Sequence, residues 1–215
     1  MEVNQKNVRW IGGLFLAAMV LYGVGNTLIS STLDSSSTAL DRLNLGLGIL
    51  LSFGNSMAVV VLAVVIYPYL EIYNKRIALG YLCARLFEAL MLAVGMISLL
   101  SVAGLEQSHP KVDAAQLIVM VAQKSNFWAY QLAMLTLGVG SIGFCYTLWK
   151  LKWVPTFLAI WGLVGYLGLA LGAIFELFGY PIGLIMSLPG GLFEVAFGIW
   201  LCLKGLSFDK INAFA

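Results

Sequence analysis

The sequence predicts an all-α membrane protein whose single domain, residues 1–215, is a bundle of six transmembrane helices. The first observation behind this prediction is composition: 61% of the residues are hydrophobic, 10% are charged, and the mean hydropathy is +0.94. Soluble domains carry about 25% charged residues, so a soluble fold of this composition could not cover its surface. A cytosolic enzyme, a secreted disulfide-linked domain, a nucleic-acid binder and a disordered chain are therefore excluded.

The second observation is six apolar runs, each long enough to cross a bilayer core of about 30 Å, which takes about 20 helical residues. Because lipid offers no partner for a backbone amide or carbonyl group, each run is expected to be a helix. The first run is longer than the core of a signal peptide and is interpreted as a retained span. The predicted spans are residues 8–29, 43–70, 77–102, 126–149, 153–178 and 182–203.

The third observation is the distribution of basic residues between these spans. One side of the predicted bundle collects most of them, namely Lys6, Arg9, Lys75, Arg76, Lys150, Lys152, Lys204 and Lys210. The other side has only Arg42, Lys111 and Lys124. Because Lys and Arg are concentrated in cytoplasmic loops, we expect a multi-pass protein of the cell inner membrane with both termini in the cytoplasm.

The longest connection, residues 104–125, lies on the external side of this topology. Asp113 and Gln116 have the spacing of a helix N-cap and its capping-box partner, and the apolar run 117–121 follows. These features predict a short external amphipathic helix between the third and fourth spans. A simple linker is an equally good interpretation.

Glycine and proline indicate how the helices pack. Gly168 and Gly172 form a small-xxx-small pair in the fifth span, which allows two helix backbones to approach closely. Pro189, followed by two glycines, removes a backbone hydrogen bond from the sixth span and predicts a kink or local unwinding there. A harmless bend and a functional break are both compatible with this pattern.

Three ionisable residues fall near the middle of the predicted membrane. At a rise of 1.5 Å per residue, Arg85, Glu88 and Glu194 lie about 13, 18 and 15 Å from the cytoplasmic edge. Such residues are costly in lipid and usually face the interior of a bundle. Arg85 and Glu88 share a helix face with Tyr81. We therefore predict that Arg85 pairs with Glu88, with Glu194 or with both.

Two interpretations of this cluster remain open. It is either a bridge that locks helices in register or part of a functional site. Two carboxylates beside one guanidinium leave an excess negative charge or a retained proton, which favours a ligand-binding or proton-coupling site.

A second set of polar residues lies in the outer half of the spans. Asn26, Asn55 and Gln131 fall about 24–28 Å from the cytoplasmic edge, and Glu176 lies near the outer rim. Together they predict a polar cavity that opens outward and narrows towards Arg85, Glu88 and Glu194. The alternatives are ordinary hydrogen bonds between amides on neighbouring helices and, for Glu176, a carboxylate that reaches the solvent.

Two similar strings hint at an internal repeat. Leu86-Phe87-Glu88-Ala89 in the third span resembles Leu192-Phe193-Glu194-Val195 in the sixth. If the chain is divided into two halves of three spans, these strings occupy corresponding positions and run in opposite directions, as in the inverted repeats of transporters. Short matches among apolar residues also arise by chance.

The chain resembles a known bacterial membrane family. The residues that support the resemblance are Arg85-x-x-Glu88 and a C-terminal pattern of Pro189, Phe193, Glu194, Gly198, Trp200 and Lys204-Gly205. The family is catalogued as a domain of unknown function, DUF4386. The resemblance covers essentially the whole chain and implies an inner-membrane protein of about six spans. It implies no mechanism.

These observations favour a protein that binds or transports a small polar, amphiphilic or lipid-like ligand. A structural or assembly protein, including a homo-oligomer, is the first alternative. The second is an intramembrane enzyme using paired carboxylates as acid and base. This alternative is weaker because His109, the only histidine, falls in a polar loop. No metal, cofactor or nucleic acid is predicted, and membrane lipids are the expected surroundings.

Overall fold

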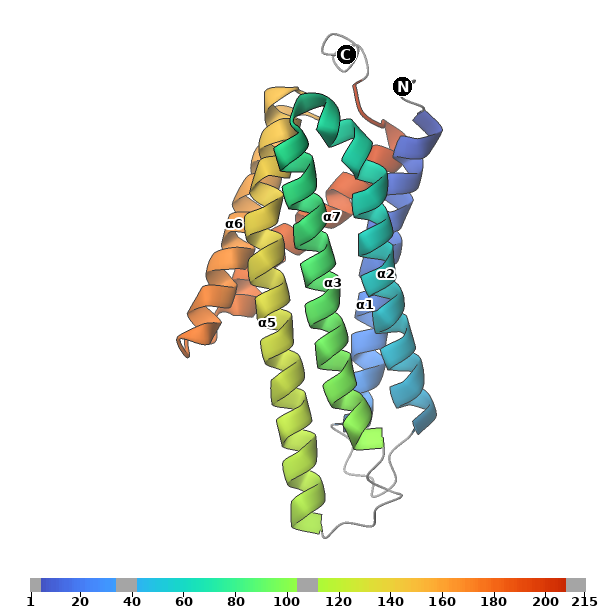
Figure 1. The fold of residues 1–215 in the computed structure, drawn as a ribbon, viewed down its shortest axis with the longest axis vertical. Coiled ribbons are helices and arrows are strands. Elements are labelled where there is room, and N and C mark those ends of the chain that lie inside the picture. The colour runs from blue at the N-terminus through green and yellow to red at the C-terminus, as the bar shows by residue number, and fades with distance from the viewer. Residues whose placement is uncertain (1–4, 34–41, 104–111, 208–215) are drawn as a thin grey trace.

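The protein is a bundle of long α-helices in this computed structural model, which describes residues 5–33, 42–103 and 112–207 (Figure 1). Within these ranges there are six helices and no strand. All six are long and apolar enough to cross a membrane, which confirms the prediction of an all-helical, multi-pass membrane protein. The helices are α1 (Gln5–Leu33), α2 (Arg42–Tyr73), α3 (Lys75–Ala103), α5 (Val112–Lys150), α6 (Thr156–Leu177) and α7 (Gly183–Leu203).

The six helices form a ring in which each helix packs against its neighbours in the sequence, and α7 closes the ring against α1. Successive helices run in opposite directions, so α1 begins and α7 ends at the same end of the bundle (Figure 1). We call this the basic end, because Arg9, Lys75, Arg76, Lys150, Lys152 and Lys204 all lie at helix boundaries there. The other is called the opposite end.

Glycines allow the helix backbones to approach closely where α7 meets α1 and where it meets α6. A Cβ atom on Gly12 of α1 would lie 2.6 Å from the carbonyl oxygen of Gly198 of α7. A Cβ atom on Gly165 of α6 would lie 2.8 Å from the Cα atom of Gly190 of α7. The pair expected in α6 has the same role, since a Cβ atom on Gly172 would lie 3.2 Å from the Cα atom of Gly183. These contacts hold α7 against both of its neighbours.

Two hydrophobic cores lie at different heights in the ring. The larger includes the rings of Phe15, Phe144 and Phe197, which pack edge to face with centroid separations of 5.3 and 5.7 Å. The smaller joins α1, α2, α3 and α5 near the opposite end, through Ile29, Leu45, Ile49, Met96, Leu99, Val102 and Ala122. The space between these cores is where the candidate site lies.

The segment expected to be a separate external amphipathic helix is the first part of α5. Residues 112–125 continue without a break into the predicted fourth span, so α5 has 39 residues. No glycine or proline occurs between Val112 and Gly138 to interrupt it, and Ala115, Val119 and Ala122 contribute to the smaller core. Asp113 lies in the first turn, where an acidic residue favours the helix. Residues 104–111, including His109, lie outside the described residues.

The expected unwinding at Pro189 is absent, because residues 183–203 are helical throughout. The Pro189 carbonyl oxygen accepts a hydrogen bond of 3.0 Å from Nε1 of Trp161 on α6. The following Gly190 packs closely on α6. Tertiary contacts on both sides of the proline thus preserve the helix.

Candidate functional site

Arg85 of α3 is the centre of a buried cluster that joins three helices. Only 1% of the residue is exposed. Its Nε donates to the Tyr81 hydroxyl at 3.0 Å, its Nη1 donates to Glu88 Oε2 at 3.1 Å, and its Nη2 donates to Glu194 Oε1 of α7 at 3.0 Å. The structure therefore confirms the prediction that Arg85 pairs with both glutamates.

Tyr166 of α6 belongs to the same cluster and was missed by the sequence analysis. Its hydroxyl donates to Glu194 Oε1 at 2.7 Å and accepts a hydrogen bond from Arg85 Nη2 at 3.3 Å. The residue lies midway along a span and is fully buried. A mid-span tyrosine whose hydroxyl needs a partner is the signal that could have identified it.

Aromatic rings surround the guanidinium on its remaining sides. Its Cζ atom lies 5.8 Å from the ring centroid of Phe15 and 5.4 Å from that of Tyr81. Both distances are in the range of cation–π attraction. Tyr81 also stacks on Phe144 with a centroid separation of 4.8 Å. The cluster therefore rests on the larger core, on the side that faces the basic end.

The charges in the cluster do not balance. Both carboxylate oxygens of Glu88 face Arg85 Nη1, whereas Glu194 uses only Oε1 for Arg85 and Tyr166. Within the described ranges, Glu194 Oε2 has no hydrogen-bond donor. With both carboxylates ionised, one guanidinium leaves an excess negative charge, which is unfavourable in a medium of low dielectric constant.

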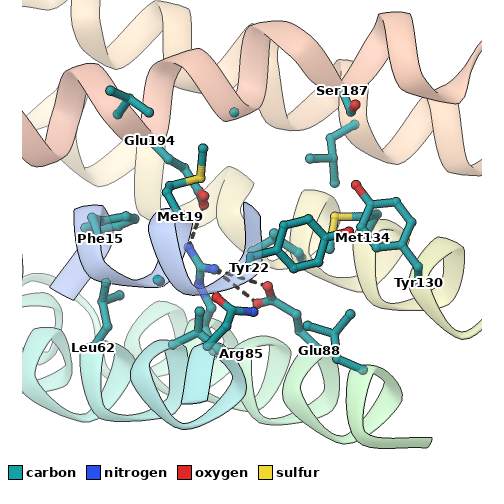
Figure 2. A pocket seen from close by; sticks show the side chains of 18 of the residues that line it. Phe15, Met19, Tyr22, Leu62, Arg85, Glu88, Tyr130, Met134, Ser187 and Glu194 are labelled. Carbon is teal, nitrogen blue, oxygen red and sulfur yellow. Dashed lines mark hydrogen bonds and ion pairs between the residues drawn. The ribbon is translucent and has the colours of Figure 1, made fainter. Parts of the chain in front are cut away.

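A cavity of about 290 Å³, here called the deep cavity, opens directly onto this cluster. Its walls come from all six helices, and Arg85, Glu88 and Glu194 lie at its base (Figure 2). Apart from these charged groups the lining is mostly apolar and aromatic, and includes the side chains of Phe15, Met19, Tyr22, Leu62, Tyr130 and Met134. An apolar cavity with a few convergent polar groups is the usual form of a small-molecule site.

A second cavity of about 340 Å³, here called the outer cavity, lies nearer the opposite end. The structure brings together the four residues of the predicted outer polar level, since Asn26, Asn55, Gln131 and Glu176 all line it. The outer cavity shares five lining residues with the deep cavity, so the two are contiguous. The shared residues are Tyr22, Asn55, Leu92, Tyr130 and Ser187.

The side-chain amides that line the outer cavity do not form hydrogen bonds with each other. Asn55 and Gln131 are 6% and 5% exposed, and neither side chain makes a hydrogen bond to any residue that the structure describes. Buried amides normally have partners. Ordinary hydrogen bonding between helices therefore does not explain these two residues, and both leave hydrogen-bonding capacity directed at the outer cavity.

Glu176 has a partner in the protein. Its Oε1 accepts a hydrogen bond of 2.9 Å from the backbone N–H of Gly183, the first residue of α7. A carboxylate at this position satisfies a free N–H group and interacts favourably with the helix dipole. Glu176 is thus partly buried and connects α6 to α7, rather than only reaching the solvent.

Fold and site together define a six-helix integral membrane protein with a buried Arg–Glu–Glu–Tyr cluster at the base of an internal cavity. The family model described as "Domain of unknown function (DUF4386)" matches residues 10–205. The chain therefore belongs to this family, as the C-terminal pattern and Arg85-x-x-Glu88 indicated. No curated protein and no solved structure matches the chain.

Proposed function

We propose that this protein binds or transports a small polar, amphiphilic or lipid-like ligand inside the helix ring. The observation that supports this most directly is the pair of contiguous cavities that end on Arg85, Glu88 and Glu194. The ligand lies along the apolar walls and directs its polar group to the cluster, while Asn55 and Gln131 supply hydrogen bonds farther out.

The cluster also has a structural consequence, because it ties α3 to α6 and α7 through Glu194 and Tyr166. A salt bridge that only holds the helices together could be enclosed completely by packed side chains, with no cavity beside it. It does not explain why a cavity opens onto all three charged groups, or why the buried Asn55 lacks a partner among the described residues. These two features favour a ligand site over a bridge.

The binding proposal can be tested by filling the junction of the two cavities. Ser187 lines both cavities, and its hydroxyl bonds only the carbonyl of Leu184 on its own helix. We expect Ser187→Trp to abolish labelling of the α1 and α5 peptides that line the cavities by a diazirine-bearing decanol in lipid nanodiscs, read by mass spectrometry. The tryptophan occupies the space that the probe would use.

Ser98→Trp is the matched control, because the Ser98 hydroxyl bonds only the Val94 carbonyl of α3 and the residue lines neither cavity. It should leave the labelling pattern unchanged. Labelling confined to lipid-facing residues in the unmodified protein would refute the proposed function.

We also propose that the protein lies in a bacterial inner membrane with the basic end in the cytoplasm. The six basic residues at that end support this orientation by the positive-inside rule. In spheroplasts of cells producing a variant without native cysteines, a membrane-impermeant maleimide should label Asp113→Cys directly. It should label Lys204→Cys only after lysis, since α5 begins and α7 ends at opposite ends of the ring. The reverse pattern would place the basic end outside.

A further inference from the structure

Packed side chains fill the ring at the basic end and the space between α1, α2, α3 and α5 at the opposite end. On the basic side of the cluster, the buried rings of Phe15, Tyr81, Phe144 and Phe197 fill the ring. At the opposite end, the smaller core joins α1, α2, α3 and α5 beyond the outer cavity. A ligand entering from the basic end, or between α1, α2, α3 and α5 at the opposite end, would have to displace these packed side chains.

The side of the ring between α1 and α7 is less complete. Close contacts between these helices join Gly12 and Phe15 to Phe197, Gly198 and Cys202, all in the half near the basic end. Towards the opposite end, α6 and α7 form a short hairpin whose tip stops well before the ends of α1, α2, α3 and α5 (Figure 1). Figure 1 also shows that α7 lies beside α1 near the basic end and diverges from it towards the tip that it shares with α6.

Three leucines on one face of α7 mark an opening of the cavities between α1 and α7, here called the mouth. Leu184, Leu188 and Leu192 are spaced four residues apart and are 77%, 55% and 58% exposed. Leu184 nevertheless lines the outer cavity, and Leu188 and Leu192 line the deep cavity. A side chain that both lines a cavity and is largely exposed lies at its opening. In a membrane, an opening between two spans at this depth faces acyl chains rather than water.

The base of the deep cavity favours a positively charged group. Glu194 Oε2 has no donor among the described residues, and the cluster has one more carboxylate than guanidinium. An ammonium group would balance this charge and supply N–H donors to the free oxygen. The stacked rings of Tyr22 and Tyr130, 6.1 Å apart between centroids, line the same cavity and present π-systems that also favour a cation.

We propose that the cavity accepts a cationic amphiphile of the long-chain primary amine type, which enters from the bilayer between α1 and α7 and places its ammonium group against Glu194. Its hydrocarbon chain leaves through the mouth beside Leu188 and remains among the lipid chains, so the cavity volume does not limit its length. This inference rests on the proposed function and specifies the chemical class and the route of the ligand.

The ligand class can be tested with probes that differ only in their polar group. The full-length protein in phosphatidylcholine nanodiscs is labelled with a diazirine-bearing decylamine, and decylamine, decanol and decanoate compete for the labelled sites. We expect label on α1 near Met19 and on α7 near Leu188, with decylamine effective at a concentration at least about tenfold lower than decanol. Decanoate should be the weakest competitor, because it adds negative charge beside Glu194.

Glu194→Gln should abolish the advantage of decylamine over decanol while the decanol affinity stays the same. Glu71→Gln is the matched control, since Glu71 pairs with Lys75 at the basic end and lines neither cavity. An undiminished preference for decylamine in Glu194→Gln would refute the proposed head-group site. If that variant does not fold, the competition series on the unmodified protein decides the ligand class by itself.

The outcomes separate this inference from the proposed function. Equal competition by decylamine and decanol at labelled cavity residues would overturn the cationic class and leave the binding function intact. Absence of cavity labelling by every probe would overturn both.

The side route has its own test. Leu188→Trp should slow labelling of the deep cavity several-fold by narrowing the mouth. Ile185→Trp, on an exposed face of α7 that lines neither cavity, should not. Equal labelling rates in these two variants would overturn access between α1 and α7.

Discussion

Replacing Arg85 by methionine should destabilise this protein more than any other single substitution in the cluster. The change leaves Glu88 and Glu194 buried without their shared cation, and it removes the donors to Tyr81 and Tyr166. Breaking a buried ion pair by removing one partner costs about 3–5 kcal/mol. The loss should appear as a lower free energy of unfolding in mixed micelles, followed by helical circular dichroism during titration with sodium dodecyl sulfate.

The triple variant Arg85→Met, Glu88→Leu, Glu194→Leu tests what the cluster is for. Replacing a whole buried ionic cluster by apolar residues of similar size is often close to neutral for stability. We expect this variant to regain most of the stability lost in Arg85→Met and to lose all preference for an amine probe. A variant that recovers both stability and amine preference would show that the cluster serves only to lock the helices.

Gly138→Ala is expected to separate α5 from α6 and to cost about 1–3 kcal/mol, as overpacking in a tight interior does. A Cβ atom on Gly138 would lie 2.6 Å from the carbonyl oxygen of Tyr166 and 2.8 Å from the backbone nitrogen of Ala170. Both are backbone atoms, so only a shift of α6 relieves the overlap. That shift moves Tyr166 away from Glu194, and amine labelling should decrease together with the free energy of unfolding.

Gly23→Ala is the matched control for this substitution. Gly23 is exposed on α1, and a Cβ atom there would meet no other atom within 4 Å. Alanine is favoured over glycine in a helix by about 1 kcal/mol, so this variant should be as stable as the unmodified protein or more so. A loss of stability at Gly23 equal to that at Gly138 would mean that helix propensity, and not the α5–α6 approach, sets the cost.

Much of the site could be predicted because charges in a membrane are few and their depths can be counted. The similar depths of Arg85, Glu88 and Glu194 indicated a shared level, and the cost of exposing them to lipid indicated the interior. Tyr166, Ser187 and Tyr130 carry no charge and occur within apolar runs. The mid-span hydroxyl of Tyr166 indicates that a partner is needed but not which one. Nothing in the local sequence of Ser187 or Tyr130 distinguishes a cavity wall from ordinary packing.

The two corrections to the predicted helices share one cause. The segment 112–125 contains too many polar residues to be recognised as part of a span, yet its inward face packs in the smaller core. Pro189 favours a kink or local unwinding, yet the helix continues through it, beside contacts with Trp161 and Gly165. In both places the contacts between helices outweigh the local preference of the chain.

Hydropathy, span length and charge by themselves determined that this protein is a six-helix membrane bundle and which ionisable residues lie deep within it. These properties are sums over contiguous residues, and lipid leaves the backbone no alternative to a helix. Only the tertiary structure decided that Glu194 meets Arg85, 109 residues away, and that the ring encloses cavities lined by α1 and α7. Those outcomes depend on how the helices approach and diverge, which is set by side-chain packing across the ring and is not encoded in any one segment.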